Sequence, residues 1–225
     1  MNENEKVLVS GFVPFECRTV NASWTIANYL LSHRNVIHAI QLPVPNWDSM
    51  TYHVKHYISI YNPNIWLAFG ESAISKQFKI EVVASTDQFP REEYPESQRL
   101  IHPDEKLCTE LAKYMSDKGY PTIISKDAGG YTCEQLLYTL LYEKPHFSYD
   151  ELDCVLNFVF FVHVPLANSC LINLHCNDEN KLKNFGFELL ERILSVVRIR
   201  NFITQHPKFE KTIKKFRESD KTYGR

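Results

Sequence analysis

Residues 121–133, PTIISKDAGGYTC, contain a short apolar run, a glycine turn and a cysteine in direct succession. The β-branched residues before the turn predict a strand, and the apolar pattern of 132–141 predicts a helix. A cysteine in the first turn of a helix is how an α/β enzyme presents a thiol nucleophile, because the partial positive charge of the helix N-terminus favours a thiolate. Free N–H groups there could hold an oxyanion. The alternative for Cys133 is a small side chain buried beneath a βα turn.

Outward from this unit, the chain alternates between predicted strands and predicted helices. The strands are Lys6–Ser10, Val36–Gln41, Asn64–Phe69, Phe78–Ala84, Pro121–Ser125 and Cys154–His163. The helices are Ser23–Ser32, Trp47–Ile60, Asp104–Lys118, Thr132–Leu141 and Asp178–Val197. Asn21 and Ser23 provide a good start signal for the first helix. This alternation predicts an α/β fold, a single-domain three-layer α/β/α sandwich with a mostly parallel, twisted sheet.

The composition limits what kind of protein this is. With 225 residues, 44% of them hydrophobic, the chain can bury one sizeable core, and we predict one domain over residues 1–204. Residues 205–225 carry many lysines and arginines among acids, with few large apolar side chains, which predicts a solvated tail. No stretch reaches the roughly 18 apolar residues of a membrane span. The net charge of −2 offers no electrostatic field for nucleic acid.

The cysteines indicate a reducing compartment rather than a disulfide framework. None of the six belongs to a CxxC pair, and Cys170, His175 and Cys176 are too small a ligand set for zinc. The polar, acidic segment Met1–Lys6 does not resemble a signal peptide. We therefore expect a cytoplasmic protein that uses neither a metal nor a cofactor.

Two further segments carry a polar side chain within an apolar run. His163 lies near the end of Phe158–Pro165, a run typical of a strand buried on both faces, and open α/β sheets place functional groups at strand ends. Glu81 lies within Phe78–Ala84, where an acid is costly unless it is paired or solvated. The alternatives are a structural histidine with satisfied ring nitrogens, and an edge strand with Glu81 facing water.

Together, Cys133, His163 and Glu81 are the groups that cysteine catalysis needs. A thiolate attacks a carbonyl carbon, an imidazole transfers the proton, and a carboxylate orients the imidazole. The order acid, cysteine, histidine is compatible with such a triad, because triads occur in several chain orders. Sequence spacing alone does not show that the three side chains meet.

Six segments, in order from Val7 to Pro165, resemble the pyroglutamyl peptidase I family, the pyrrolidone-carboxylate peptidases. They are Val7–Phe15 with its Gly-Phe-x-Pro-Phe loop, Val20–Trp24, Leu42–Val44, Ile80–Ala84, Ala128–Cys133 and Val162–Pro165. No single segment is specific, but six of them in the right order are hard to obtain by chance. The α/β/α fold that the resemblance implies agrees with the pattern of strands and helices.

The resemblance implies a role for each matched residue. Cys133 would be the nucleophile, His163 the base and then the acid, and Glu81 the group that orients His163. The implied substrate-binding residues are Phe12, Phe15, Asn21, Arg91, Tyr131 and Thr132. Aromatic walls suit the small, flat, uncharged 5-oxoproline ring, whose lactam a few polar groups can fix. For Phe12 and Phe15 the alternative is ordinary core packing beside a strand end.

The chain departs from the family pattern in several places. Gly70–Ser75 replaces the family's Gly-Gln-Ala-Gly-Gly-Arg turn and lacks its double glycine and its arginine. Either Arg91 or Gln88 takes the position of a second family arginine, and the loop before the nucleophile turn is shorter. Glu134 replaces the family's asparagine, and its charge would oppose a thiolate at Cys133 if it pointed inward.

The resulting expectation is a cysteine exopeptidase that removes an N-terminal pyroglutamyl residue from peptides. Peptides with N-terminal pyroglutamate are the expected partners, and binding to nucleic acid or to membranes is not expected. Assembly into a homo-oligomer is a possibility that the sequence does not decide. One alternative is a catalytically weak or inactive relative that binds a peptide terminus or a partner protein, which the altered Gly70–Ser75 turn favours. Another alternative is a hydrolase for a different small cyclic amide.

Overall fold

The computed structural model describes residues 5–15, 18–43, 49–87, 98–144, 156–166 and 179–206. The chain divides into two compact units, residues 1–188 and 189–225. The first unit holds the sheet and the candidate site, and the described residues of the second continue a helix as far as Gln205. The division into a domain over 1–204 and a tail over 205–225 stays a prediction, since residues 207–225 lie outside the described residues.

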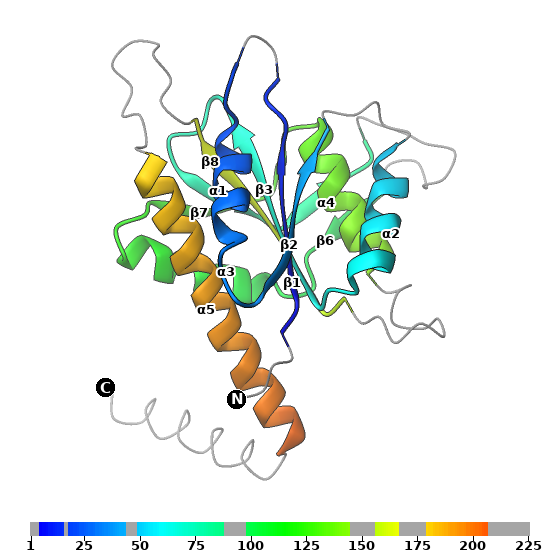
Figure 1. Cartoon of the computed structure of the whole chain (residues 1–225), viewed down its shortest axis with the longest axis vertical. Coiled ribbons are helices and arrows are strands. Elements are labelled where there is room, and N and C mark those ends of the chain that lie inside the picture. The colour runs from blue at the N-terminus through cyan, green and yellow to red at the C-terminus, as the bar shows by residue number, and fades with distance from the viewer. Residues whose placement is uncertain are drawn as a thin grey trace. The chain divides into compact units, whose positions relative to one another are not determined.

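The observed strands and helices follow the predicted order (Figure 1). The strands are β1 (Val7–Phe12), β2 (Val36–Leu42), β3 (Ile65–Ser72), β4 (Phe78–Glu81), β5 (Val83–Ser85), β6 (Arg99–Ile101), β7 (Thr122–Ser125) and β8 (Phe158–Pro165). The helices are α1 (Ala22–Leu30), α2 (Met50–Tyr61), α3 (Glu105–Asp117), α4 (Thr132–Glu143) and α5 (Glu179–Gln205). The strand–turn–helix unit over residues 121–141 is therefore confirmed.

Six of the strands form one mostly parallel sheet in the order β2-β1-β3-β8-β4-β7. β1, β2, β3 and β8 run parallel to one another, and their carboxyl ends meet at one edge. β4 pairs antiparallel with β8 and parallel with β7. The other described strands, β5 and β6, form a small antiparallel sheet. The prediction of a mostly parallel α/β sheet is confirmed.

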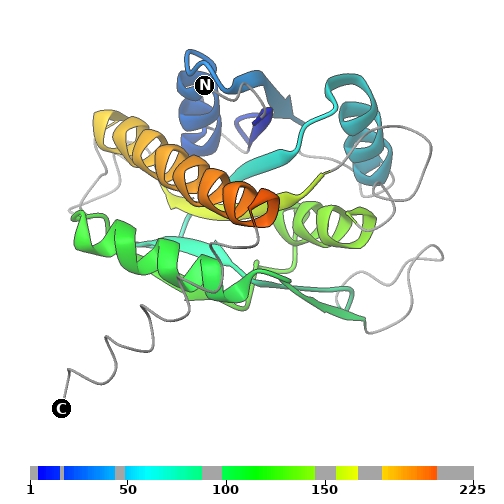
Figure 2. The same ribbon diagram turned by 90° about the horizontal axis from the view of Figure 1, so that it is seen from below.

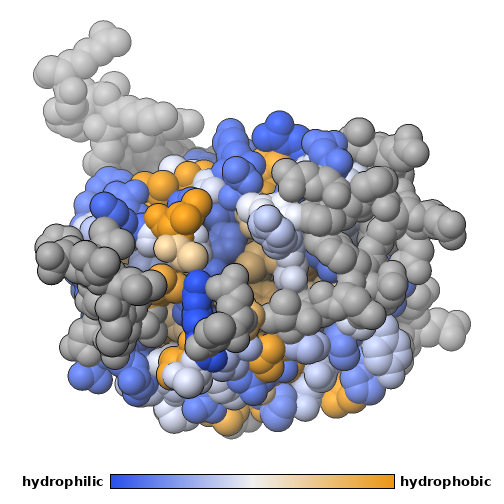
Figure 3. Space-filling model, turned by 90° about the horizontal axis from the view of Figure 1, so that it is seen from above, coloured by the Kyte–Doolittle hydropathy of each residue, from blue (hydrophilic) through white to orange (hydrophobic). Residues whose placement is uncertain are grey.

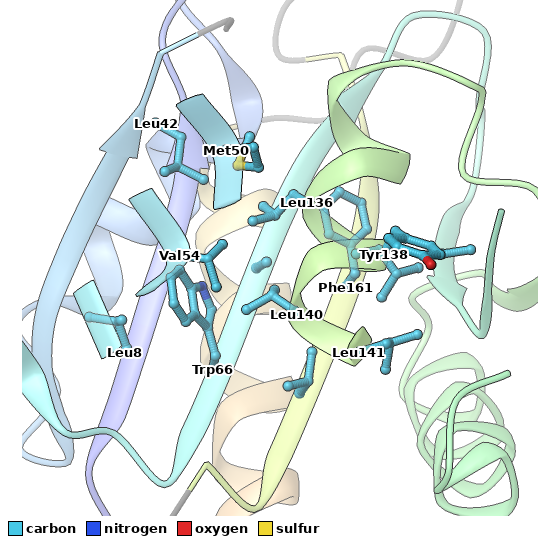
Figure 4. Packing of buried hydrophobic residues seen from close by; sticks show 14 of the residues in the cluster. Leu8, Leu42, Met50, Val54, Trp66, Leu136, Tyr138, Leu140, Leu141 and Phe161 are labelled. Atoms are coloured by element: carbon cyan, nitrogen blue, oxygen red, sulfur yellow. The ribbon is translucent and has the colours of Figure 1, made fainter. Parts of the chain in front are cut away.

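Helices cover both faces of the sheet, as Figure 2 shows for α1 and α3 on one side and α2 and α4 on the other. Between α2, α4 and the sheet lies a core in which Val54, Trp66, Leu136, Leu140 and Phe161 pack together (Figure 4). These side chains are fully buried. Burying each one contributes about 1.5–3 kcal/mol of transfer free energy. This packing fixes α4, and with it Cys133, over β3 and β8.

Two features of the sheet differ from the prediction. The predicted strand Phe78–Ala84 is divided at Val82, whose N–H donates to the Ser125 carbonyl while its own carbonyl accepts from His102 N–H. The chain therefore changes partners after Glu81, and β5 pairs with the unpredicted strand β6.

No helix in the described residues is long and apolar enough to cross a membrane.

The start of α1 is held by the predicted cap at Asn21. Its Oδ1 accepts from the Ser23 N–H at 2.9 Å and from the Ser23 hydroxyl at 2.6 Å, and its Nδ2 donates to the Val13 carbonyl at 3.1 Å. The Ser23 hydroxyl oxygen accepts in turn from the Phe12 N–H at 3.0 Å. The cap therefore connects α1 to the loop that follows β1.

Asn21→Ala is expected to lower the free energy of unfolding by about 2 kcal/mol, because α1 loses its cap and the Val13 carbonyl loses its donor. Asn28→Ala is the matched control, since Asn28 is exposed on the same helix and alanine is a better helix former. Denaturant unfolding curves measure both variants. Equal stability of the two would contradict a structural role for the cap.

Candidate active site

The candidate site is a cavity of about 520 Å³ at the edge where the carboxyl ends of β1, β3 and β8 meet the N-terminus of α4. Figure 3 views this side of the molecule and shows a recess bordered by hydrophobic and hydrophilic residues. The residues that line the cavity are Phe12, Phe15, Asn21, Glu71, Ser72, Ala73, Ile74, Lys79, Asp127, Ala128, Gly129, Tyr131, Thr132, Cys133 and His163. Parallel sheets commonly place their sites at this edge.

The nucleophile turn has the backbone that its glycines allow. Gly129 and Gly130 have φ values of 91° and 68°, a left-handed conformation that side-chain-bearing residues rarely adopt. α4 begins at Thr132, so Cys133 lies in its first turn. The first N–H groups of a helix have no acceptor within the helix, and in α4 this end borders the cavity through Thr132 and Cys133. The turn therefore places a thiol at the end of the helix where backbone N–H groups can stabilise an oxyanion.

His163 and Glu81 are joined by a hydrogen bond of 2.8 Å between Nδ1 and Oε1. Glu81 is fully buried and His163 is 7% exposed. Because β4 lies between β8 and β7, the alternative of an edge strand with Glu81 facing water is wrong. The second oxygen of Glu81 has no hydrogen-bond partner within the described residues. Glu81 thus holds one ring nitrogen of His163 and leaves the other for the cavity.

Cys133 and His163 lie together above the backbone of Gly70 on β3. A Cβ atom built on Gly70 would lie 2.8 Å from Cys133 Sγ, 3.2 Å from His163 Cδ2 and 2.8 Å from Phe161 Cζ. Gly70 is the direct strand partner of His163. The structure therefore brings Glu81, His163 and Cys133 into one continuous series of contacts, which sequence spacing could not establish.

The electrostatics of the site favour a charged imidazole. Burial lowers the pKa of His163, but the charge of Cys133 and the hydrogen bond to it, followed by the contact with Glu81, outweigh that cost and raise the pKa to about 10. An imidazolium between a thiolate and a carboxylate is the arrangement in which each charge stabilises its neighbour. The cysteine and histidine are thus placed to share one proton.

The imidazole of His163 is expected to titrate near pH 10 instead of its ordinary 6.5, and at a lower pH in Cys133→Ala, because Cys133 supplies the largest favourable contribution. NMR titration of the ring protons measures this. The internal control is His102, whose pKa burial holds below its ordinary value against a hydrogen bond to the Val159 carbonyl. A His163 that titrates near 6.5 in both proteins would contradict the ion pair.

The same pKa shift predicts how stability depends on pH. The pKa of His163 is higher in the folded state than in the unfolded state, so its contribution is fully present below about pH 6.5. That contribution is lost as the pH rises through about 10. Unfolding free energies should fall across this window in the wild type, and in Cys133→Ala the fall should be smaller and should end at a lower pH.

The carboxylate of Glu134, the residue after the nucleophile, accepts hydrogen bonds from two backbone N–H groups. Its carboxylate accepts from the Gly130 N–H at 2.7 Å and from the Ser85 N–H at 2.9 Å. Burial raises the pKa of Glu134, and these two hydrogen bonds lower it in part. Its reach back to the preceding turn resembles the glutamate of a capping box. Glu134 therefore holds the nucleophile turn against β5.

Some of the residues predicted to contact substrate line the cavity, and others lie outside the described residues. Phe12, Phe15, Asn21 and Thr132 line the cavity, although the Asn21 amide is already used by the cap of α1. Tyr131 also lines it, but its side chain is 77% exposed. Arg91 and Gln88 lie outside the described residues. The aromatic side of the cavity is therefore formed by the end of β1 and the loop that follows it.

An ion pair holds this aromatic loop, and the sequence analysis did not predict it. The Glu71 carboxylate accepts from the Arg18 guanidinium and, at 2.6 Å, from the Ala22 N–H at the start of α1. The Arg18 guanidinium lies over the Phe15 ring, 4.6 Å from its centroid. A carboxylate at a helix N-terminus is favourable. Glu71 could have been noticed only as an acid directly after the apolar run of β3.

Two solved structures with similar folds are peptidases of the same kind. The pyrrolidone carboxyl peptidase from Thermococcus litoralis has a TM-score of 0.62 and 21% sequence identity, covering 85% of this chain and 95% of that one. The pyroglutamyl peptidase I from Bacillus amyloliquefaciens has a TM-score of 0.64 and 21% identity, covering 82% of this chain and 92% of that one. At these identities the likeness establishes the fold.

Sequence relatives point to the same family. The pyrrolidone-carboxylate peptidase of Bacillus subtilis is 28% identical over 153 residues, covering 61% of this chain and 70% of that one. The enzyme of the same name from Thermosipho melanesiensis is 26% identical over 151 residues, covering 61% and 74%. The sequence model of the pyroglutamyl peptidase family matches residues 5–182, which is most of the chain. The chain therefore belongs to the pyroglutamyl peptidase family and is a cysteine-type peptidase.

Proposed function

We propose that this protein is an exopeptidase that hydrolyses the amide bond after an N-terminal pyroglutamyl residue. Cys133 is the nucleophile, His163 the base and then the acid, and Glu81 the group that orients His163. The observation that carries the proposal is the contact series from Glu81 through His163 to Cys133 at the wall of the cavity. Membership of the family supports the substrate class.

The shape and lining of the cavity support a small uncharged ring as its occupant. A volume of about 520 Å³ is within the range of small-molecule sites, which bury most of the ligand surface. Phe12 and Phe15 provide aromatic surface on one side. An N-terminal pyroglutamate has no ammonium group, so the site needs no carboxylate to receive one. The Glu71 carboxylate is accordingly occupied by Arg18 and the start of α1.

In the first half of the reaction, the Cys133 thiolate attacks the carbonyl carbon that follows the ring. The electron pair of the C=O bond moves to oxygen, and the backbone N–H of Cys133 at the start of α4 stabilises that oxyanion. When the intermediate collapses, the C–N bond breaks and the imidazolium of His163 gives its proton to the leaving amine. The products of this half are a thioester on Cys133 and a peptide shortened by one residue.

In the second half, water releases the thioester. Neutral His163 takes a proton from the water as its oxygen attacks the thioester carbonyl, and the C–S bond breaks to regenerate the thiolate. Glu81 keeps the ring in one orientation throughout, because its Oε1 holds Nδ1. Free pyroglutamate leaves, and the imidazolium–thiolate pair is restored. His163 therefore gives up one proton in the first half and regains one from water in the second, so the cycle needs no external acid.

The experiment that tests the proposal is release of a fluorogenic amine from its L-pyroglutamyl amide under reducing conditions. The L-prolyl amide is the matched substrate, since it has the same ring size but lacks the lactam carbonyl and carries a basic nitrogen. We expect the pyroglutamyl amide to react at least about 100-fold faster, as sites built to pair a polar group reject analogues without it. Folded protein that releases no amine would instead support the non-catalytic relative.

We also propose that the protein works in the cytoplasm. The described cysteines, Cys108 and Cys133, are both free thiols. Oxidation of Cys133 would remove the nucleophile, so the proposed chemistry needs a compartment that keeps thiols reduced. Fractionation of cells that express the protein tests this location.

A further inference from the structure

Lys79 is a positively charged residue in the cavity wall that the proposed reaction does not use. It lines the same cavity as Cys133 and His163, and it is partly buried. In the antiparallel pairing of β4 with β8, Lys79 lies directly opposite His163. Directly opposed residues in such a pair place their side chains on the same face of the sheet. The Lys79 side chain therefore shares the face that carries the imidazole.

The acids that line the cavity do not neutralise Lys79. The Glu71 carboxylate is held by Arg18 and the start of α1, and one oxygen of Asp127 accepts from the Gly129 N–H at 2.9 Å. Within the described parts of the chain, no carboxylate lies within 4.0 Å of the Lys79 ammonium. A cation that lines a cavity and has no such partner raises the local concentration of anionic ligands there.

The strand order places Lys79 on the opposite side of the nucleophile from the aromatic residues. Phe12 and Phe15 come from β1 and the loop after it, and Lys79 comes from β4, with β3 and β8 between them. A substrate whose ring lies against the aromatic residues and whose carbonyl lies at Cys133 directs its leaving residue towards β4. The Lys79 ammonium is therefore on the leaving-group side of the site.

We propose that Lys79 binds a carboxylate on the residue that follows the pyroglutamyl ring, so that the site prefers short or acidic substrates. The carboxylate is either an acidic side chain on that residue or the C-terminus of a dipeptide. This inference rests on the proposed function, because that reaction defines the orientation of the substrate. Charge-assisted hydrogen bonds between lysine and carboxylate would provide the preference.

Four peptides test the assignment and separate the two sources of the carboxylate. Pyroglutamyl-aspartyl amide against pyroglutamyl-asparaginyl amide tests the side chain, and pyroglutamyl-alanine against its amide tests the C-terminus. In the wild type, kcat/KM should be about five- to tenfold higher for at least one carboxylate peptide than for its neutral partner, mainly through KM. Lys79→Met should remove this preference, and Lys79→Arg should retain it.

Lys76→Met is the matched control, because Lys76 is exposed in the preceding turn and does not line the cavity. It removes the same charge and should leave the preference unchanged. Equal kcat/KM within both pairs in the wild type would overturn the assignment. So would a Lys79→Met variant whose kcat falls equally for all four peptides, since Lys79 would then act on the reaction and not on a carboxylate.

Calorimetric binding of the same peptides to Cys133→Ala makes the result independent of turnover. Tighter binding of a carboxylate peptide, lost when Lys79→Met is added, supports the assignment even if the wild type hydrolyses none of the peptides. In that case the proposed function fails and the carboxylate site stands. If the wild type instead hydrolyses the peptides but neither kcat/KM nor binding favours a carboxylate peptide over its neutral partner, the proposed peptidase activity is supported and the carboxylate site is contradicted.

Discussion

Cys133→Ala is expected to abolish release of the amine from an L-pyroglutamyl amide, lowering kcat on the order of 10⁴-fold or more. The variant keeps the cavity, the aromatic residues and the Glu81–His163 hydrogen bond, but it has no atom that can form the thioester. Losing the nucleophile of a catalytic triad costs about as much as losing the whole triad, because the groups act as a unit. Continuous fluorescence assays at saturating substrate measure kcat directly.

Cys108→Ala is the matched control for this prediction. Cys108 is the other free cysteine of the described residues, buried in α3, where its Sγ lies 3.8 Å from His102 Nδ1. It does not line the cavity, so its replacement should leave kcat within about twofold and cost some stability through the small space it leaves. If Cys133→Ala retained a kcat near that of the wild type, the nucleophile would have to be another group.

The rate of alkylation distinguishes the thiols of Cys133 and Cys108 in the absence of substrate. Iodoacetamide near neutral pH should modify Cys133 faster than Cys108, since Cys133 is partly exposed, lies at a helix N-terminus and contacts an imidazolium. Equal rates for the two thiols would count against a nucleophile at the cavity wall.

The strand–turn–helix over residues 121–141 could be predicted because its signals are local. β-branched residues favour a strand, consecutive glycines permit two left-handed residues, and leucines three and four apart form one face of a helix. The observed φ values of Gly129 and Gly130 agree with that reasoning. Glu134 adds a hydrogen bond to the Gly130 N–H of the same turn, a contact that was not among the sequence-based predictions.

The direction and the break of β4 could not be predicted in the same way. Only a short turn joins β3 to β4, yet β8, which begins more than seventy residues after the end of β4, lies between them. The apolar pattern of Phe78–Ala84 is continuous, and the break at Val82 arises from hydrogen bonds to Ser125 and His102. β6 is too short for periodicity to reveal it and exists only through its pairing with β5.

The residues of the site also fall into two groups, those that could be selected from the sequence and those that could not. Cys133, His163 and Glu81 could be selected from the sequence because each is a chemically active residue in an unusual local setting. Glu71 and Lys79 could not, because their roles depend on neighbours that the fold supplies, namely Arg18 for the first and His163 for the second. Residue type and local pattern identify reactive groups, while the strand order decides which other groups surround them.

Gly70→Ala is expected to lower kcat about 100-fold, although no functional group is removed. The new Cβ would lie 2.8 Å from Cys133 Sγ and 3.2 Å from His163 Cδ2, closer than carbon and sulfur atoms pack. The thiol and the imidazole must then move apart from each other or from the substrate carbonyl. Displacing reacting groups by about 1 Å costs on the order of 100-fold in rate. KM should change much less, because Phe12 and Phe15 are not displaced.

Gly119→Ala distinguishes this effect from a loss of stability. Gly119 has a φ of 88° and open space around its Cα, so alanine there is strained without a clash. That variant should lose about 1 kcal/mol of unfolding free energy and keep its kcat. Gly70→Ala should lose about 1–3 kcal/mol through overpacking and lose its kcat as well. A Gly70→Ala enzyme with kcat within threefold of the wild type would mean that the thiol and imidazole tolerate displacement, and close approach to β3 would then not set their geometry.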